Sequence, residues 1–507
     1  MTATVPPTAE LRWEPPGRGD WRGLHDHFPR ALTPEYQEIL HDGMTEGEAE
    51  WITAYGFPIS TIRPAFVHGR VFISAVPLVG RPSDRLPPTW LMKLAVRLVP
   101  AFRRRTLAAG RALSDRPWLA EAMHWFDVER PAWEERNAEL EAVDVTALDD
   151  TGLLAHLAAV RAAVGEGYRA HFRLHGCDLV PTGLYLAESN RWGIDPMDAA
   201  GLLAGSSPAS RGDAAPPAWC LLSGYDLDER CAAELPAWRP AEPRPAVDAD
   251  PSVERALRAK VPEAARAQWE QYLADARATC GVRDSNGILT AAWPAGLLRR
   301  AMLEAGRRLT SRGALDTAEH AVELTVVELR GAIEGAPTAP SAADVRTRAE
   351  ARRALSLHRA PAALGPPQDL PLDAMPPAVA DLAAALLALR DLGITPPGHR
   401  DDLSGFGLGA GTVTGRACVA ADPAAALARF EPGDIVVTAG TCPAWNSILA
   451  LAGGVVTEEG GPLSHAAVIA RELGLPAVIG CAGAVDAIAD GAVVVLDLDD
   501  GRVRLAG

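Results

Sequence analysis

Apolar residues recur three and four positions apart over most of residues 90 to 400, which is the period of an amphipathic helix. One clear stripe is formed by Leu298, Met302, Ala305 and Leu309. The other faces of this run are mostly charged, at Arg299, Arg300, Glu304, Arg307, Arg308 and Arg312. We interpret these charges as a solvated face, and the pattern predicts that most of the stretch is helical.

A different pattern precedes the helical stretch. Residues 57–80 hold short β-branched and aromatic runs broken by proline and glycine, which favours a hairpin with its turn around His68 and Gly69. We therefore expect residues 1–333 to form a mainly α-helical domain that includes this small β-hairpin region.

Proline-rich stretches divide the chain further. Those at 206–217 and 236–251 are interpreted as surface loops. Two more, at 334–344 and 364–377, flank a short arginine-rich segment. We expect residues 334–403 to be a helical, proline-rich linker that contains a hinge.

The sequence pattern of residues 404–507 is typical of a compact α/β domain. Short apolar runs such as DIVVT, PAVIG and AVVVLD are separated by glycine and aspartate, as in buried strands. One strong helix is predicted between Ser464 and Leu473.

Length, charge and cysteine content limit the classes of function that the chain can have. A chain of 507 residues favours more than one domain, and a net charge of −16 argues against binding to nucleic acid or an anionic membrane. The seven cysteines are scattered without CxxC pairs, which fits a reducing cytoplasm. We see no signal peptide and no apolar run of about 20 residues that could span a bilayer.

The stretch from Thr457 to Pro476 carries the most chemical information. Gly460 and Gly461 permit a tight bend after a strand, and Ser464 is a good helix N-cap, so His465 falls in the first helical turn. Free N–H groups at a helix N-terminus favour a phosphoryl group and disfavour a protonated imidazole. A neutral histidine there can act as a nucleophile toward phosphorus.

The whole pattern, TxxGGxxSHAAxxARELGxPAVxG, resembles the phosphohistidine signature of the phosphoenolpyruvate-utilising enzyme family. The resemblance extends through 407–417, 432–445 and 474–491. It implies a three-layer β/β/α swivelling domain over 404–507, with His465 as the residue that carries the phosphoryl group. On this basis Thr457 either bonds the phosphoryl group or closes the loop, and Arg471 pairs either with phosphate or with groups around Glu472.

The upstream region resembles, more weakly, the helical acceptor-binding domain of rifampicin phosphotransferase-like enzymes. In GVRDSNGI, Arg283 and Asp284 match an arginine–acid pair near the transferred phosphate in that family, and a guanidinium suits a phosphoryl oxyanion. Gly287 occupies the position of a lysine in that family, so the resemblance does not extend to the acceptor chemistry of the rifampicin enzymes.

Candidates for the acceptor pocket are His171 and His175, and also Arg63, Tyr185 and Trp192, and the sequence does not choose among them. Two histidine pairs are also candidates for a metal site. His171 and His175 are four residues apart and would share a helix face, and His25 and His27 have an HxH spacing. Neither pair has the full spacing of a metal site, so we expect no bound metal.

The resemblance begins at the acceptor domain, with no match to the family's ATP-grasp region. We therefore expect ATP and Mg²⁺ to be bound by a separate ATP-grasp partner, and His465 to pass phosphate to a small organic hydroxyl or carboxylate. The alternatives are a binding or regulatory homologue with reduced turnover, and a phosphocarrier that serves another protein.

Overall fold

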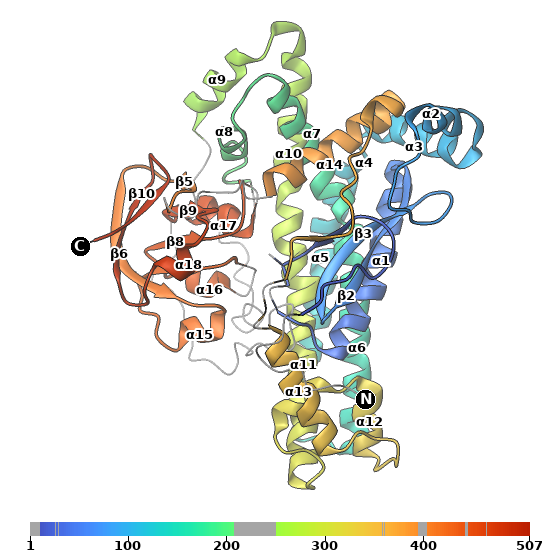
Figure 1. Cartoon of the computed structure of the whole chain (residues 1–507), viewed down its shortest axis with the longest axis vertical. Coiled ribbons are helices and arrows are strands. Elements are labelled where there is room, and N and C mark those ends of the chain that lie inside the picture. Colours follow the sequence, from blue (N-terminus) through green and yellow to red (C-terminus); the bar gives the residue numbers. More distant parts are fainter. Residues whose placement is uncertain are drawn as a thin grey trace.

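The computed structural model describes residues 11–206, 250–393 and 403–506, except positions 26, 29, 357, 359 and 463 and the stretch 442–444. A long helical region lies beside a smaller C-terminal α/β domain, and helix α17 lies on the side of that domain next to α7 and α10 (Figure 1). None of the helices within these ranges has the length and apolar character needed to cross a membrane.

The helical region contains fourteen of the helices that the structure describes. They are α1 (Pro34–Tyr55), α2 (Thr89–Leu98), α3 (Pro100–Asp115), α4 (Pro117–His124), α5 (Arg130–Glu141), α6 (Asp150–Arg173), α7 (His175–Arg191), α8 (Pro196–Gly201), α9 (Pro251–Lys260), α10 (Glu263–Asn286), α11 (Trp293–Ser311), α12 (Val326–Ile333), α13 (Ala342–Ser356) and α14 (Pro377–Gly393). A π-helical turn, η4 (Gly287–Ala292), joins α10 directly to α11. Such turns are frequent at functional sites.

A four-stranded sheet packs against the helices near the N-terminus. Its strands are β1 (Trp21–Gly23), β2 (Ile59–Val67), β3 (Arg70–Pro77) and β4 (Ala363–Leu364), in the order β2-β3-β1-β4. The turn between β2 and β3 is His68-Gly69, and both residues have positive φ, as a tight right-twisted hairpin requires.

The expected linker is packed onto the helical region over most of its length. Strand β4 pairs antiparallel with β1 through Trp21 and Leu364. Helix α14 packs along α7, and its Leu382 and Ala385 are fully buried. The stretches at 206–217 and 236–251 lie almost entirely outside the described residues.

The apolar stripe of α11 is confirmed, because Leu298, Met302, Ala305 and Leu309 are fully buried. The solvated face that we expected opposite this stripe is wrong in part, since Arg299 and Glu304 are also buried.

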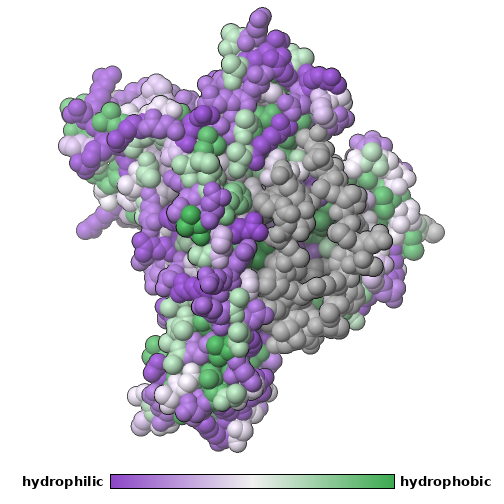
Figure 2. All heavy atoms as spheres, turned by 180° about the vertical axis from the view of Figure 1, so that it is seen from behind, coloured by the Kyte–Doolittle hydropathy of each residue, from purple (hydrophilic) through white to green (hydrophobic). Residues whose placement is uncertain are grey.

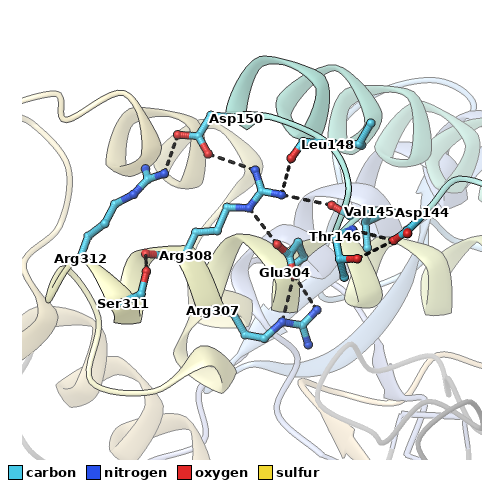
Figure 3. Close-up of polar contacts among 10 residues, drawn as sticks. All are labelled: Asp144, Val145, Thr146, Leu148, Asp150, Glu304, Arg307, Arg308, Ser311 and Arg312. Carbon is cyan, nitrogen blue, oxygen red and sulfur yellow. Dashed lines mark hydrogen bonds and ion pairs between the residues drawn. The ribbon is translucent and has the colours of Figure 1, made fainter.

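Arg308 explains how the charges of α11 are accommodated. Its guanidinium donates to Glu304, to Asp150 at the start of α6, and to the carbonyl oxygens of Val145 and Leu148, at 2.7–3.2 Å (Figure 3). Arg308 therefore joins α11 to the beginning of α6.

The C-terminal domain is built on a mixed seven-stranded sheet in the order β11-β10-β6-β7-β8-β9-β5. Its strands are β5 (Phe406–Leu408), β6 (Thr412–Val419), β7 (Ile435–Thr438), β8 (Gly454–Thr457), β9 (Ala477–Ile479), β10 (Val493–Asp497) and β11 (Arg502–Leu505), and its helices are α15 (Pro423–Leu427), α16 (Asn446–Leu449), α17 (His465–Leu473) and α18 (Ala484–Ala487). Strands β6 to β9 are parallel. The loops that follow β7 and β8 therefore leave the sheet at the same edge.

The back of the molecule is mostly hydrophilic where it is coloured, with apolar residues scattered among the polar ones (Figure 2). Large apolar side chains are exposed on the peripheral helix α2, including Trp90 and Leu98.

Candidate functional site

His465 is the first residue of α17, as the sequence predicted. The N-cap is Ser464, whose hydroxyl accepts from the N–H of Ala467. Gly460 has φ +117°, and a Cβ there would lie 2.7 Å from the Ser464 hydroxyl oxygen. A glycine at 460 is therefore required for the bend that leads into the helix.

The His465 ring is held by one hydrogen bond. Its Nδ1 lies 2.9 Å from the hydroxyl of Thr441, which is in the loop after β7. Its Nε2 is buried and has no hydrogen-bond partner among the described residues, although the residue as a whole is only half-buried. Nε2 is therefore closed off from water in this arrangement without being bonded to the protein.

The surroundings keep His465 neutral. Burial lowers the pKa of His465 to about 3, and the positive charges of His27 and Arg283 add to the effect. The positive end of α17 acts in the same direction. At neutral pH the ring has an available nitrogen lone pair.

The helical region contains two further histidines, and the charge of Arg283 contributes to the pKa of each. His171 lies in the last turn of α6 and His175 is the first residue of α7, with their ring centroids 5.2 Å apart. The Nδ1 of His171 forms a short hydrogen bond with Asn286 Oδ1, and the Nδ1 of His175 lies 2.9 Å from Glu48 Oε1. Each ring is thus fixed by one polar partner.

The surroundings shift the pKa values of these two histidines in opposite directions. Burial lowers the pKa of His171 to about 3, with further contributions from His175, His27 and Arg283. Burial also opposes charge on His175, but the hydrogen bond and the charge of Glu48 outweigh it and raise the pKa of His175. His171 is therefore neutral at pH 7.

A small pocket of about 40 Å³ separates α17 from the helical region. That volume suits about three water molecules, since one needs roughly 10–15 Å³. Its lining includes Asp178, Cys280 and Arg283 from the helical region and Val468, Arg471 and Glu472 from α17. Two guanidinium groups and two carboxylates therefore meet at the pocket.

The remaining residues singled out from the sequence lie as follows. Thr457 ends β8, is fully buried, and its hydroxyl has no hydrogen-bond partner among the described residues. Its carbonyl accepts from the N–H of Cys481. Gly461 is buried, and Asp284 lies on α10 with its side chain outside the described part.

The structure places Arg283 in the lining of the pocket beside α17. The charges of Arg283 and His27 contribute to the low pKa values of both His465 and His171. His25 has other partners: its Nε2 lies 3.0 Å from the carbonyl oxygen of Pro361, and its ring packs on Phe72. In the described part of the chain, no three histidine, cysteine or acidic side chains are arranged to hold a metal ion.

Sequence reasoning missed Thr441 and Asn286. A signal for Thr441 existed, because it follows β7, the parallel neighbour of the strand that leads to His465. No comparable signal marked Asn286, which reaches His171 across a separation of 115 residues.

Comparisons with known proteins agree with the motif. Residues 430–501 match the model of the PEP-utilising enzyme mobile domain. An uncharacterised protein of Mycobacterium tuberculosis is 33% identical over 211 residues, or 41% of this chain and 21% of that protein. Rifampicin phosphotransferase of Streptomyces sviceus is 44% identical over 112 residues, or 21% of this chain and 13% of that enzyme.

Phosphoenolpyruvate synthase of Escherichia coli is 48% identical over 73 residues, which are 14% of this chain and 9% of that enzyme. The chain thus spans between 9% and 21% of the length of these three relatives. The matching model and these named relatives identify the C-terminal region of the chain as a mobile domain of the phosphoenolpyruvate-utilising enzyme family.

Proposed function

We propose that this chain is the carrier and acceptor component of a phosphotransferase: His465 takes up a phosphoryl group and passes it to a small organic acceptor held beside Arg283. The observation that carries the proposal is the neutral His465 ring at the start of α17, with an unbonded Nε2. The alternatives, a regulatory homologue and a carrier that serves another protein, are outcomes of the tests below.

Thr441 prepares the nucleophile. If Nδ1 of His465 donates its proton to the Thr441 hydroxyl, the lone pair is left on Nε2, the nitrogen without a partner. The low pKa of His465 keeps this lone pair free of a proton at neutral pH. Nε2 is thus the atom that forms the bond to phosphorus.

Arg283 supplies charge where the phosphoryl group is handed over. Its positive charge reaches His465 in this arrangement, and a guanidinium can donate two parallel hydrogen bonds to phosphoryl oxygens. The N-terminal amides of α17 supply further donors. Positioning and charge neutralisation account for most of the catalysis of phosphoryl transfer.

The donor in this proposal is a separate ATP-grasp protein that binds ATP and Mg²⁺. Because Nε2 is buried while α17 faces the helical region, the C-terminal domain must move away to be loaded. It then returns to the arrangement described here for delivery. The function therefore needs two positions of this domain.

The test is to incubate the full chain with a candidate ATP-grasp protein, Mg²⁺ and ATP labelled at the β- or γ-phosphate. We expect label that is acid-labile and base-stable, absent in His465→Ala and retained in His41→Ala, which alters an exposed histidine on α1. Undiminished label in His465→Ala contradicts the carrier role. Label that only another protein discharges identifies a protein-directed phosphocarrier.

A further inference from the structure

The outer helix α2 exposes a row of large apolar side chains. Trp90, Leu94 and Leu98 follow one another four residues apart, so they share one face of the helix. Trp90 is 67% exposed and Leu98 is 68% exposed, and no residue of α2 is buried. Half of the fourteen large apolar side chains that the described residues expose lie between positions 79 and 107, namely Val79, Leu86, Trp90, Leu91, Leu94, Leu98 and Leu107. Exposed apolar side chains gathered in this way mark a site of interaction.

Cationic side chains accompany this apolar row. Residues 79–111 contain eight lysines and arginines and one acidic residue, Asp84. On α2 itself, Lys93 and Arg97 flank the row, and Lys93 lies 3.6 Å from Asp373. Six exposed cations in this stretch have no ion-pair partner among the described residues, namely Arg81, Arg85, Arg97, Arg103, Arg104 and Arg111. The face around α2 is therefore both apolar and strongly basic.

Helix α3 holds α2 on the outside of the helical region. Ala109 and Ala112 of α3 are buried, and Arg105 donates to the carbonyl oxygens of Ile52 and Ile59 at 3.0 and 3.3 Å. Figure 1 shows α2 and α3 on the side of the helical region away from the C-terminal domain. A surface that binds α2 therefore leaves the C-terminal domain free to move.

We propose that α2 docks the protein on an anionic lipid surface. The row of Trp90, Leu94 and Leu98 enters the interface between headgroups and acyl chains, and the surrounding lysine and arginine side chains contact lipid phosphates. Amphipathic helices with basic residues beside tryptophan and leucine lie in this interface, and tryptophan is enriched there. The proposal is independent of the carrier function of His465.

Other occupants fit this face less well. A second copy of the chain would bring the same cations face to face in a symmetric contact. A donor protein bound at α2 would lie on the far side of the helical region from the domain that carries His465. The cations are spread over the loop before α2, α2 itself and α3, which suits the laterally extended negative charge of a membrane.

The net charge of −16 does not oppose this contact. Charges are screened beyond about 8 Å at physiological ionic strength, so a membrane meets the local cations and not the average of the whole chain. Our expectation that the chain avoids anionic membranes, drawn from its net charge, was therefore too coarse for this face.

The experiment measures co-sedimentation of the full chain with vesicles of phosphatidylcholine alone, or of equal parts of phosphatidylcholine and phosphatidylserine. We expect binding to the vesicles that contain phosphatidylserine. The double variant Trp90→Gln, Leu94→Gln should weaken this binding by about 10- to 100-fold, since burial of one side chain of this size contributes about tenfold or more. Val327→Gln, which changes an apolar residue that is 78% exposed on α12, should bind as the wild type does.

A second variant tests the charges. Replacement of Arg97, Arg103 and Arg104 together by glutamine should weaken binding to the phosphatidylserine vesicles by about 100-fold, since each cation near an anionic surface contributes about fivefold. Added salt should weaken binding of the wild type. Arg330→Gln, at an exposed arginine on α12, is the control. Circular dichroism of each variant checks that the helical content is unchanged.

Absence of binding to the phosphatidylserine vesicles would overturn the proposal, as would equal binding by the wild type and the Trp90→Gln, Leu94→Gln variant. Sedimentation velocity without vesicles tests the other occupants. A dimer that this variant abolishes would assign the face to a second copy. Binding of the candidate donor protein that this variant abolishes, with no binding to vesicles, would assign the face to an acidic protein, and either result would overturn the lipid assignment.

Discussion

Acid should separate the C-terminal domain from the helical region, because His465 is forced to stay neutral between them. Burial and the charges of His27 and Arg283 lower its pKa to about 3. When the domain moves away, the ring loses these neighbours and its pKa returns toward the ordinary value of about 6.5. Protonation then stabilises the separated arrangement.

The size of the effect follows from the two pKa values. Contact between the domains is fully stable above the pKa of the separated histidine and weakens as the pH falls from about 6.5 toward 3. At about pH 5 the protonated form of an exposed imidazole exceeds its neutral form roughly 30-fold, and this ratio favours separation of the domains by at most about 2 kcal/mol.

Small-angle X-ray scattering of the full chain at about pH 7.5 and about pH 5, at constant ionic strength, measures this separation as an increase in radius of gyration. His465→Asn removes the titrating group and should reduce the increase, while His41→Asn should behave as the wild type. An equal increase in His465→Asn would show that another group drives the opening. No increase in the wild type would refute the reasoning altogether.

Three further predictions concern single contacts. Thr441→Val should slow labelling of His465 about 3- to 10-fold, the worth of one hydrogen bond of about 0.5–1.5 kcal/mol, and Thr441→Ser should restore the rate in the same assay. Arg283→Gln should slow discharge of labelled protein to ethanol by about 10²- to 10³-fold while labelling proceeds, as expected for the loss of one charge-stabilising donor. Arg352→Met should lower the free energy of unfolding in urea by about 3–5 kcal/mol, because it leaves the buried carboxylate of Glu323 unpaired. The control Arg346→Met removes only an exposed ion pair and should lower the free energy of unfolding by no more than about 1 kcal/mol.

The local features of the fold could be predicted from the sequence. Helix α17 begins after Ser464 and ends before Gly474, which has φ +58°, because capping and left-handed termination depend on neighbouring residues. The stripe of α11 was likewise visible, since burial of one helix face follows the 3.6-residue period.

Features that depend on distant contacts could not be predicted. The burial of Arg299 and Glu304 depends on how α6 and the segment η5 (Ala318–Glu323) pack against α11. The sequence of α11 alone carries no information about this packing. The link between His171 and Asn286 depends on how α6 and α10 meet. The sequence therefore located the proposed nucleophile, whereas the groups that orient the rings of His465 and His171 could be found only in the structure.

The buried position of His465 Nε2 has a consequence for the order of steps in the proposed cycle. Loading and delivery must alternate in that cycle, because Nε2 is inaccessible to a separate donor protein while α17 lies against the helical region. Exclusion of water from Nε2 in this arrangement would also limit hydrolysis of a phosphohistidine during transfer. Each return of the domain in the proposed cycle would thus deliver a single phosphoryl group.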